Sequence, residues 1–205
     1  LSNFNLPCPS SGGAGDYHVI TRSFMKNDKI RHADILTFAK SLIHGCRKLH
    51  EEAEILHCDI KAANLCWDRS SGVVSLLDIG HAQLEAGAEW YRGTYGFEAP
   101  EIGKWEQPTP HTFASDTYSV GMTVLKVIGD CSDAGSTTRV DEGDLSREVE
   151  VEMVRVVAEK LCKEGPSERM SLSEAWTKLD EYSSPCISFP LRKRLCVSHK
   201  QAPTS

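Results

Sequence analysis

The sequence predicts a mainly α-helical domain of the α+β class with one small β-hairpin near its centre. Apolar residues recur at three- and four-residue steps over residues 33–50 and 149–162, which is the period of amphipathic helices. A strongly apolar run over residues 115–128 and an amphipathic run over residues 173–182 predict two more helices. Two short apolar runs around a polar turn, at residues 65–77, are typical of a hairpin.

Composition limits the class of protein. The 205 residues suffice for one domain with a sizeable core, and 40% of them are hydrophobic. The formal net charge of −6 disfavours a nucleic-acid binder that relies on bulk positive charge. No apolar run is long enough to cross a membrane, and the start lacks a charged segment followed by an apolar one. We therefore expect a soluble, intracellular protein with neither nucleic acid nor membrane as partner.

The eight cysteines raise the question of a disulfide framework, because their number is even. They are scattered without a C-x-x-C pair, and Cys46 and Cys162 fall on apolar helix faces, so we expect reduced thiols. The neighbouring His57, Cys58 and Cys66 offer no ligand pair at zinc spacing, which argues against a zinc site.

The first elements precede the hairpin. Residues 1–16 are rich in Ser, Gly, Pro and Asn, and we expect a flexible N-terminal segment there. Residues 17–21 are β-rich and predict a short strand. The helix over residues 33–50 follows, with Asp34 near its start, where a negative charge suits the helix dipole.

The hairpin brings two oxygen-bearing side chains together. Its strands are predicted at residues 65–67 and 73–77, and residues 68–72 between them have turn chemistry. Asn64 directly precedes the first strand and Asp78 directly follows the second, so both lie at the same end of the hairpin. Their oxygens can share a magnesium ion there.

Residues 57–64, His-Cys-Asp-Ile-Lys-Ala-Ala-Asn, form a loop with the groups that phosphoryl transfer needs. A carboxylate, Asp59, would orient the attacking hydroxyl, and a cation, Lys61, would steady the γ-phosphate. An amide oxygen, from Asn64, would hold a metal ion. An isolated Asp-x-Lys is more often a solvated loop, but the motifs that follow argue against that interpretation.

The pattern H-x-D-x-K-x-x-N of residues 57–64 resembles the catalytic loop of eukaryotic protein kinases. Further matches follow in the order that the family has. They are Asp78-Ile79-Gly80 for its D-F-G, Ala99-Pro100-Glu101 for its A-P-E, Asp116 for the central-helix acid, and Arg169 for the late arginine. Together they resemble the C-terminal lobe of a kinase. Lys61, and Thr94 in the Gly-Thr-x-Gly run, resemble the Ser/Thr type.

The resemblance implies ATP and Mg²⁺ as cofactors and a protein as substrate. It implies that Asn64 and Asp78 coordinate the metal ion, and that Gly80, together with Asp78, belongs to the motif that binds the nucleotide. It also implies four structural contacts: His57 packs the loop, Thr94 contacts the catalytic Asp and Lys, Asp116 clamps the loop backbone, and Glu101 pairs with Arg169.

Departures from the family pattern are equally informative. No Gly-rich loop, strand lysine or partnering helix glutamate can be placed, so we expect the N-terminal lobe to be essentially absent. Residues 17–21 take the place of its last strand. Cys58 stands where most kinases have an Arg that pairs with a phosphorylated activation loop. The polar stretch over residues 129–147 predicts that the substrate-docking helix is reduced or missing.

The sequence therefore predicts three segments: the N-terminal segment 1–16, a kinase-like C-lobe over 17–182, and a basic, disordered tail over 183–205. The run Leu191-Arg192-Lys193-Arg194 is a weak signal for nuclear targeting, so we expect a cytoplasmic location with the nucleus as the alternative.

Three functions compete. The first is a Ser/Thr protein kinase, present as a truncated C-lobe that is inactive alone. The second is a non-catalytic kinase-like module that holds a partner protein on the lobe surface. The third, a small-molecule kinase of the aminoglycoside type, is disfavoured by Gly93-Thr94 and by residues 99–101, which build a peptide-accepting segment in the family that the chain resembles.

Overall fold

A computed structural model describes residues 17–19, 30–85, 88, 93–102, 109–132 and 142–183. The predictions for the N-terminal segment 1–16 and for the basic tail lie outside these residues, except that Ser183 ends the last helix. No helix in the described part of the chain combines the length and apolarity that a membrane crossing requires.

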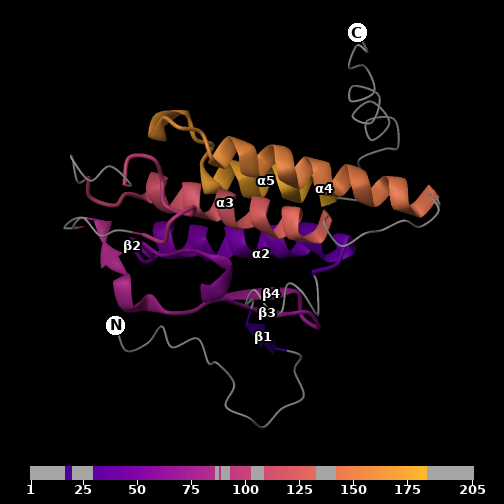
Figure 1. Ribbon diagram of the computed structural model, residues 1–205, viewed down its shortest axis with the longest axis horizontal. Coiled ribbons are helices and arrows are strands. Elements are labelled where there is room, and N and C mark those ends of the chain that lie inside the picture. The colour runs from indigo at the N-terminus through magenta and orange to yellow at the C-terminus, as the bar shows by residue number, and fades with distance from the viewer. Residues whose placement is uncertain are drawn as a thin grey trace.

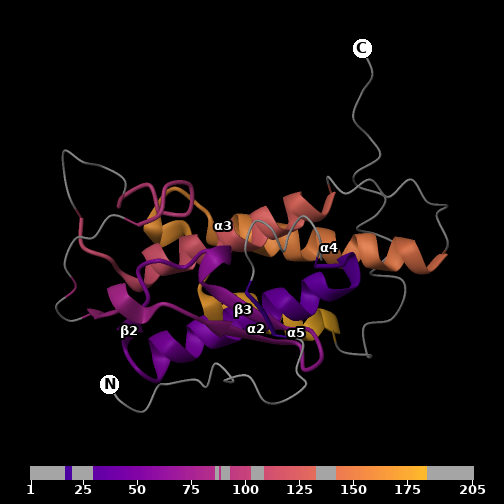
Figure 2. The same cartoon turned by 60° about the horizontal axis from the view of Figure 1, so that its bottom comes forward.

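Four α-helices form most of the described structure (Figure 1). They are α2 (His32–Glu51), α3 (Phe113–Ser132), α4 (Glu142–Leu161) and α5 (Leu172–Ser183). Helix α2 packs against α3, α4 and α5, and on its other side against the strands, as Figures 1 and 2 show. The predicted helix-rich α+β fold is observed.

Helix α2 is the centre of the core because its apolar stripe is complete. Ile35, Phe38, Leu42 and Cys46 are fully buried at three- and four-residue steps. The Phe38 ring meets Trp67 of the hairpin edge to face, with 5.7 Å between ring centroids. The predicted helix over residues 33–50 is therefore confirmed and is longer by one residue at each end.

The predicted hairpin consists of β3 (Leu65–Asp68) and β4 (Val73–Leu76), paired antiparallel. At its turn Asp68 accepts hydrogen bonds from both Ser70 and Ser71, the turn chemistry that the sequence indicates. Ser41 of α2 accepts a hydrogen bond from the Val74 amide at 2.8 Å, which fastens β4 to the helix.

The short strand predicted over residues 17–21 is observed as β1 (Tyr17–Val19), and residues 20 and 21 lie outside the described part of the chain. It pairs antiparallel with β3, so the sheet order is β1-β3-β4. The strand thus extends the hairpin sheet, where it supplies hydrogen-bond partners to the second edge of β3. The sequence does not predict this pairing, and the equivalence of the strand to the last N-lobe strand of the family stays a prediction.

A second, two-stranded sheet is not predicted from the sequence. In this sheet β2 (Ile55–Leu56), just before the catalytic-loop motif, pairs with β5 (Gln83–Leu84), just after the D-F-G-like motif. Three short 3₁₀ turns complete the described elements. They are η1 (Ala62–Asn64), η2 (Ile79–His81) and η4 (Pro166–Glu168).

The stretch over residues 129–147 is more helical than predicted. Helix α3 continues through Gly129 to Ser132, and α4 already begins at Glu142. A Cβ on Gly129 would meet no atom within 4 Å, so close packing does not require a glycine at this position of the helix. The remaining residues, 133–141, lie outside the described part of the chain.

Candidate functional site

The catalytic-loop motif is anchored by one buried carboxylate. Asp116 of α3 is 1% exposed and accepts hydrogen bonds from the backbone amides of His57 at 2.6 Å and Cys58 at 3.0 Å. Cys58 has a φ of 65°, a left-handed conformation that lets consecutive amides converge on one anion. Helix α3 thus fixes the backbone immediately before Asp59.

A third partner of Asp116 is His50, at the end of α2. Its Nε2 lies 3.1 Å from Oδ2 of Asp116, and its ring stacks on Phe113 with 4.6 Å between centroids. Burial raises the pKa of Asp116, but the hydrogen bonds and charges of His50 and His57 outweigh it, so the pKa lies below its usual value. Sequence reasoning missed His50, because a histidine near a helix end carries no signal of a partner 66 residues away.

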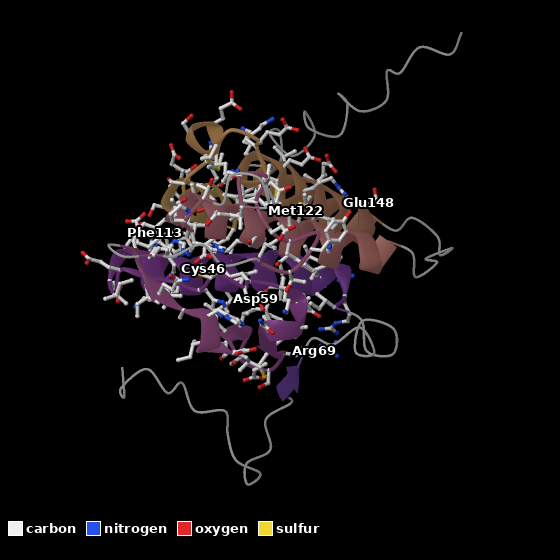
Figure 3. All side chains as sticks on the ribbon, turned by 60° about the vertical axis from the view of Figure 1, so that its left-hand side comes forward. Cys46, Asp59, Arg69, Phe113, Met122 and Glu148 are labelled. Atoms are coloured by element: carbon white, nitrogen blue, oxygen red, sulfur yellow. The ribbon has the colours of Figure 1, made fainter. Side chains whose placement is uncertain are left out.

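Asp59, Lys61, Asn64 and Thr94 form one hydrogen-bonded cluster. Lys61 Nζ donates to Oδ2 of Asp59 at 2.6 Å and to Oγ1 of Thr94 at 2.8 Å. Thr94 donates to the other carboxylate oxygen at 2.6 Å, and the Asn64 amide donates to Oδ2 at 3.0 Å. Figure 3 places Asp59 between the strands and the helices. The structure therefore brings Thr94 to both residues that the resemblance names.

The surroundings keep Asp59 charged. Burial alone raises the pKa of this carboxyl group, but hydrogen bonds from Lys61, Thr94 and Asn64, together with the Lys61 charge, lower it below its usual value. A carboxylate that is ionised at neutral pH can accept a hydrogen bond from a hydroxyl substrate, which is the first requirement of a group that orients an attacking oxygen.

Asn64 and Asp78 lie at the same end of the hairpin, as the sequence predicts. The amide of Leu77, the residue before Asp78, donates to the carbonyl of Asn64 at 2.8 Å. Asp78 is exposed and has a φ of 58°, and its Oδ1 accepts a hydrogen bond from the Gly80 amide at 3.4 Å. His57 is fully buried, and its Nε2 lies 3.0 Å from the Leu77 carbonyl, so its ring braces this end of the hairpin.

This end of the hairpin fits a magnesium ion that binds together with a nucleotide. Mg²⁺ usually takes one or two protein oxygens and completes its shell with phosphate oxygens and water. Asp78 offers an exposed carboxylate. Asn64 turns its amide nitrogen toward Asp59, so its oxygen is the atom left to face a cation. In the part of the chain that the structure describes, no group of three His, Cys, Asp or Glu side chains could hold a metal alone.

Glu101 and Arg169 form two short hydrogen bonds, both 2.6 Å long, between carboxylate and guanidinium. The pair fastens the segment after Thr94 to the connection between α4 and α5. Of the five predicted structural residues, His57, Thr94 and Asp116 lie in or against the loop of Asp59, whereas Glu101 and Arg169 pair with each other.

Comparisons with known proteins show which sequences this chain resembles. The sequence model of the protein kinase domain matches residues 13–204. Mitogen-activated protein kinase kinase kinase ANP1 of Arabidopsis thaliana is 35% identical over 100 residues, which are 46% of this chain and 14% of that protein. The dual specificity protein kinase zak2 of Dictyostelium discoideum is 28% identical over 141 residues, 62% of this chain and 21% of that protein.

A further relative is similar over more of the chain. The LRR receptor-like serine/threonine-protein kinase EFR of Arabidopsis thaliana is 25% identical in an alignment 220 positions long. This alignment covers 90% of this chain and 20% of that protein. In these comparisons the chain spans between 14% and 21% of the length of its curated relatives.

Proposed function

Because this chain belongs to the protein kinase family, we propose that it supplies the catalytic-loop half of a Ser/Thr kinase that phosphorylates a protein hydroxyl with ATP. The observation that carries the proposal is the cluster of Asp59, Lys61 and Thr94, in which each member bonds to the other two. Thr94 lies 35 residues from Asp59, so the contact depends on the fold and not on local sequence.

In this proposal Asp59 orients the substrate hydroxyl and accepts its proton, since its lowered pKa keeps it ionised. Lys61, 2.6 Å from the carboxylate, lies beside the transferred phosphoryl group and balances its charge. Thr94 holds the segment that would present the substrate against the loop. The result is a preorganised site, in which the charges are in place before the substrate arrives.

Asn64 and Asp78 would hold the magnesium ion, which supplies charge neutralisation at the phosphates when it is bound. The Gly80 amide fixes the Asp78 carboxylate from its own turn. Asp78 and Ile79 are exposed, Ile79 by 53%, so this edge is accessible to a second body.

That second body would be the ATP-covering lobe. Phosphotransfer needs a Gly-rich loop and a lysine–glutamate ion pair for the nucleotide phosphates. The sequence offers no position for them, so we propose that they are supplied in cis by a longer form of the protein or in trans by a partner.

A non-catalytic, kinase-like binding module is the second candidate. The observation that favours it is Cys58, which is 3% exposed and takes the place of a phosphate-binding Arg in the family motif. The intact cluster at Asp59 favours the enzyme instead, because a binding module has no need of it.

The experiment is a kinase assay on a form of the protein that carries an ATP-covering lobe. Asp59→Asn and Asp78→Asn should each abolish phosphotransfer while the chain stays folded. Asp180→Asn is a matched control, because it removes the same charge from a partly exposed ion pair with Lys40. Activity that survives in both Asp59→Asn and Asp78→Asn would leave the binding module as the function.

A further inference from the structure

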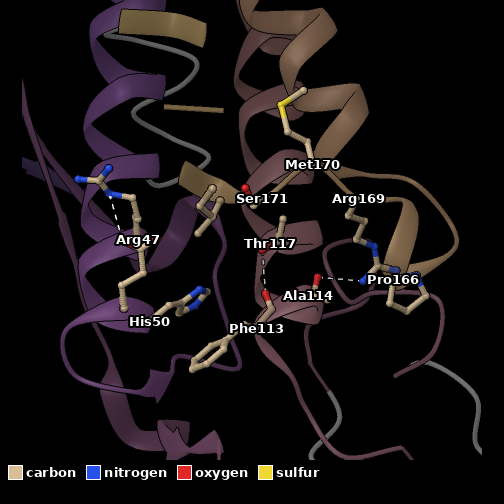
Figure 4. Close-up of a pocket in the computed structure, with 11 residues that line it drawn as sticks. Arg47, His50, Phe113, Ala114, Thr117, Pro166, Arg169, Met170 and Ser171 are labelled. Carbon is tan, nitrogen blue, oxygen red and sulfur yellow. Dashed lines mark hydrogen bonds and ion pairs between the residues drawn. The ribbon is translucent and has the colours of Figure 1, made fainter. Parts of the chain in front are cut away.

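A cavity of about 370 Å³ lies between the end of α2, the start of α3 and the connection from α4 to α5 (Figure 4). Its walls include Phe113, Leu172, Met170 and Pro166, with His50 between the helices. The volume is typical of a small-molecule site and too small for a helix of a partner protein. None of the residues proposed to contact substrate or magnesium lines it.

The charges around the cavity are already balanced. His50 is bonded to Asp116, and Arg169 holds Glu101 in two hydrogen bonds. Arg47 lies 3.8 Å from Glu51, with its guanidinium over the ring of Trp176, and its buried Nε has no hydrogen-bond partner among the described residues. A charged ligand would lose its hydration here for at most one hydrogen bond from a guanidinium that already faces a carboxylate, so the cavity favours an uncharged one.

The walls favour an aromatic ligand. Phe113 packs with one side on the His50 ring and is only partly buried, and so is Met170, so a flat ring can replace the solvent against an aromatic side chain and a flexible thioether. Burial of such a ring against apolar side chains is the main source of binding free energy.

His50 connects the cavity to the catalytic loop. It lines the cavity and contacts Asp116, which in turn accepts the amides of His57 and Cys58, directly before Asp59. A ligand that moves the His50 ring therefore acts on the carboxylate that positions the loop.

We propose that this cavity is a regulatory site for a small, uncharged aromatic molecule, which acts on the catalytic loop through His50 and Asp116. The site does not require phosphotransfer, so it can be tested on the 205-residue chain whatever the outcome of the kinase assay.

The probe is 6-fluoroindole, titrated by ¹⁹F NMR, with ¹⁵N spectra that follow the amides of His57 and Cys58. Saturable binding that shifts both amides is the expected result. Ala114→Phe fills the cavity without removing the Ala114 carbonyl, which accepts a hydrogen bond from Arg169. It should weaken binding by about tenfold or more, because the ring can no longer be buried.

Two further variants make the test decisive. Ala114→Leu fills less space and serves if the Phe variant does not fold. Ala33→Phe is the matched control, because Ala33 is exposed and does not line the cavity, and it should leave binding unchanged. Three outcomes would overturn the proposal: no saturable binding up to the solubility of the probe, unchanged affinity in both Ala114 variants, or bound probe that leaves both amides unshifted.

Discussion

Arg169 and Glu101 are joined by two parallel hydrogen bonds although they lie 68 residues apart. The Arg169 side chain is 1% exposed and that of Glu101 18%. The remaining guanidinium hydrogens go to the carbonyls of Ala114, Lys163 and Glu164. One side chain thus ties the A-P-E segment, the start of α3 and the α4–α5 connection together.

Arg169→Ala should therefore leave the chain close to unfolding. Removal of one partner of a buried ion pair typically costs about 3–5 kcal/mol, because the other charge remains buried alone. A domain is stable by only about 5–15 kcal/mol, so a large part of that stability would be lost. Thermal and urea unfolding measure the effect, and an unchanged melting temperature would contradict the prediction.

Arg155→Ala is the control for this prediction. Its partner Glu152 lies 3.4 Å away, and both side chains are more than a third exposed, at 35% and 40%. Such a surface pair is worth at most about 1 kcal/mol, so Arg155→Ala should unfold almost as the wild type does.

Asp116→Asn should destabilise the chain by about 1–3 kcal/mol, because the amide group turns a donor toward amides that need an acceptor. Asp116→Ala should cost at least as much and also lower activity. The amides of His57 and Cys58 should exchange faster with solvent in both variants. Protection of these two amides that equals the wild type would argue against the anchoring role.

The same carboxylate predicts a pH dependence. The folded state lowers the pKa of Asp116, so its stabilisation is complete above the unfolded value of about 3.9 and is lost as the pH falls through the folded value. The stability difference between wild type and Asp116→Asn should be constant at neutral pH and shrink in acid. Urea unfolding across this range measures it, and a difference that grows in acid would contradict the assignment.

The elements that the sequence predicts are those with local signals. Helix α2 is visible because each turn contributes a buried residue, and the β3–β4 hairpin because its turn has the right chemistry. The positions of Asp59, Asn64 and Asp78 follow from motif order and from the hairpin itself.

The elements that it misses depend on the tertiary structure. Strand β5 is two residues long, and only its pairing with β2 makes it a strand. The edge of β3 that β1 covers cannot be inferred from the apolar pattern of either strand. His50 acquires its role only because α3 brings Asp116 to it.

The 205-residue chain alone should bind Mg-ATP weakly and show no appreciable phosphotransfer. In the proposed function Asp78 and Asn64 hold the metal, but we place no Gly-rich loop or strand lysine in the sequence to cover the nucleotide phosphates. Titration calorimetry with and without Mg²⁺ measures the ATP affinity. Asp78→Asn should remove any dependence of that affinity on Mg²⁺. Micromolar affinity or clear autophosphorylation would overturn the prediction.

Cys58 and Cys162 should react slowly with iodoacetamide at pH 8. Burial, assisted at Cys58 by the charge of Asp116, raises the pKa of each thiol to about 12, and only the thiolate reacts. Because these pKa values are raised, their contribution to stability is complete below the unfolded value of about 8.5 and is lost as the pH rises toward 12. Peptide mapping by mass spectrometry should show fast labelling of these two cysteines only when the chain is unfolded in urea. Equal labelling rates with and without urea would contradict the prediction.

Activity should not depend on phosphorylation of the activation segment. The Cys58 side chain is 3% exposed, and the Gln83 amide lies 3.8 Å from its sulfur, so this position presents no cation to a phosphorylated residue. Tyr95 is 83% exposed and open to modification, whereas Thr94 is held by Asp59 and Lys61. We therefore expect the activity of a form with an ATP-covering lobe to persist after phosphatase treatment. Cys58→Ser, which keeps the size of the side chain, should behave the same way, and loss of activity on dephosphorylation would show that phosphate-driven ordering operates by another route.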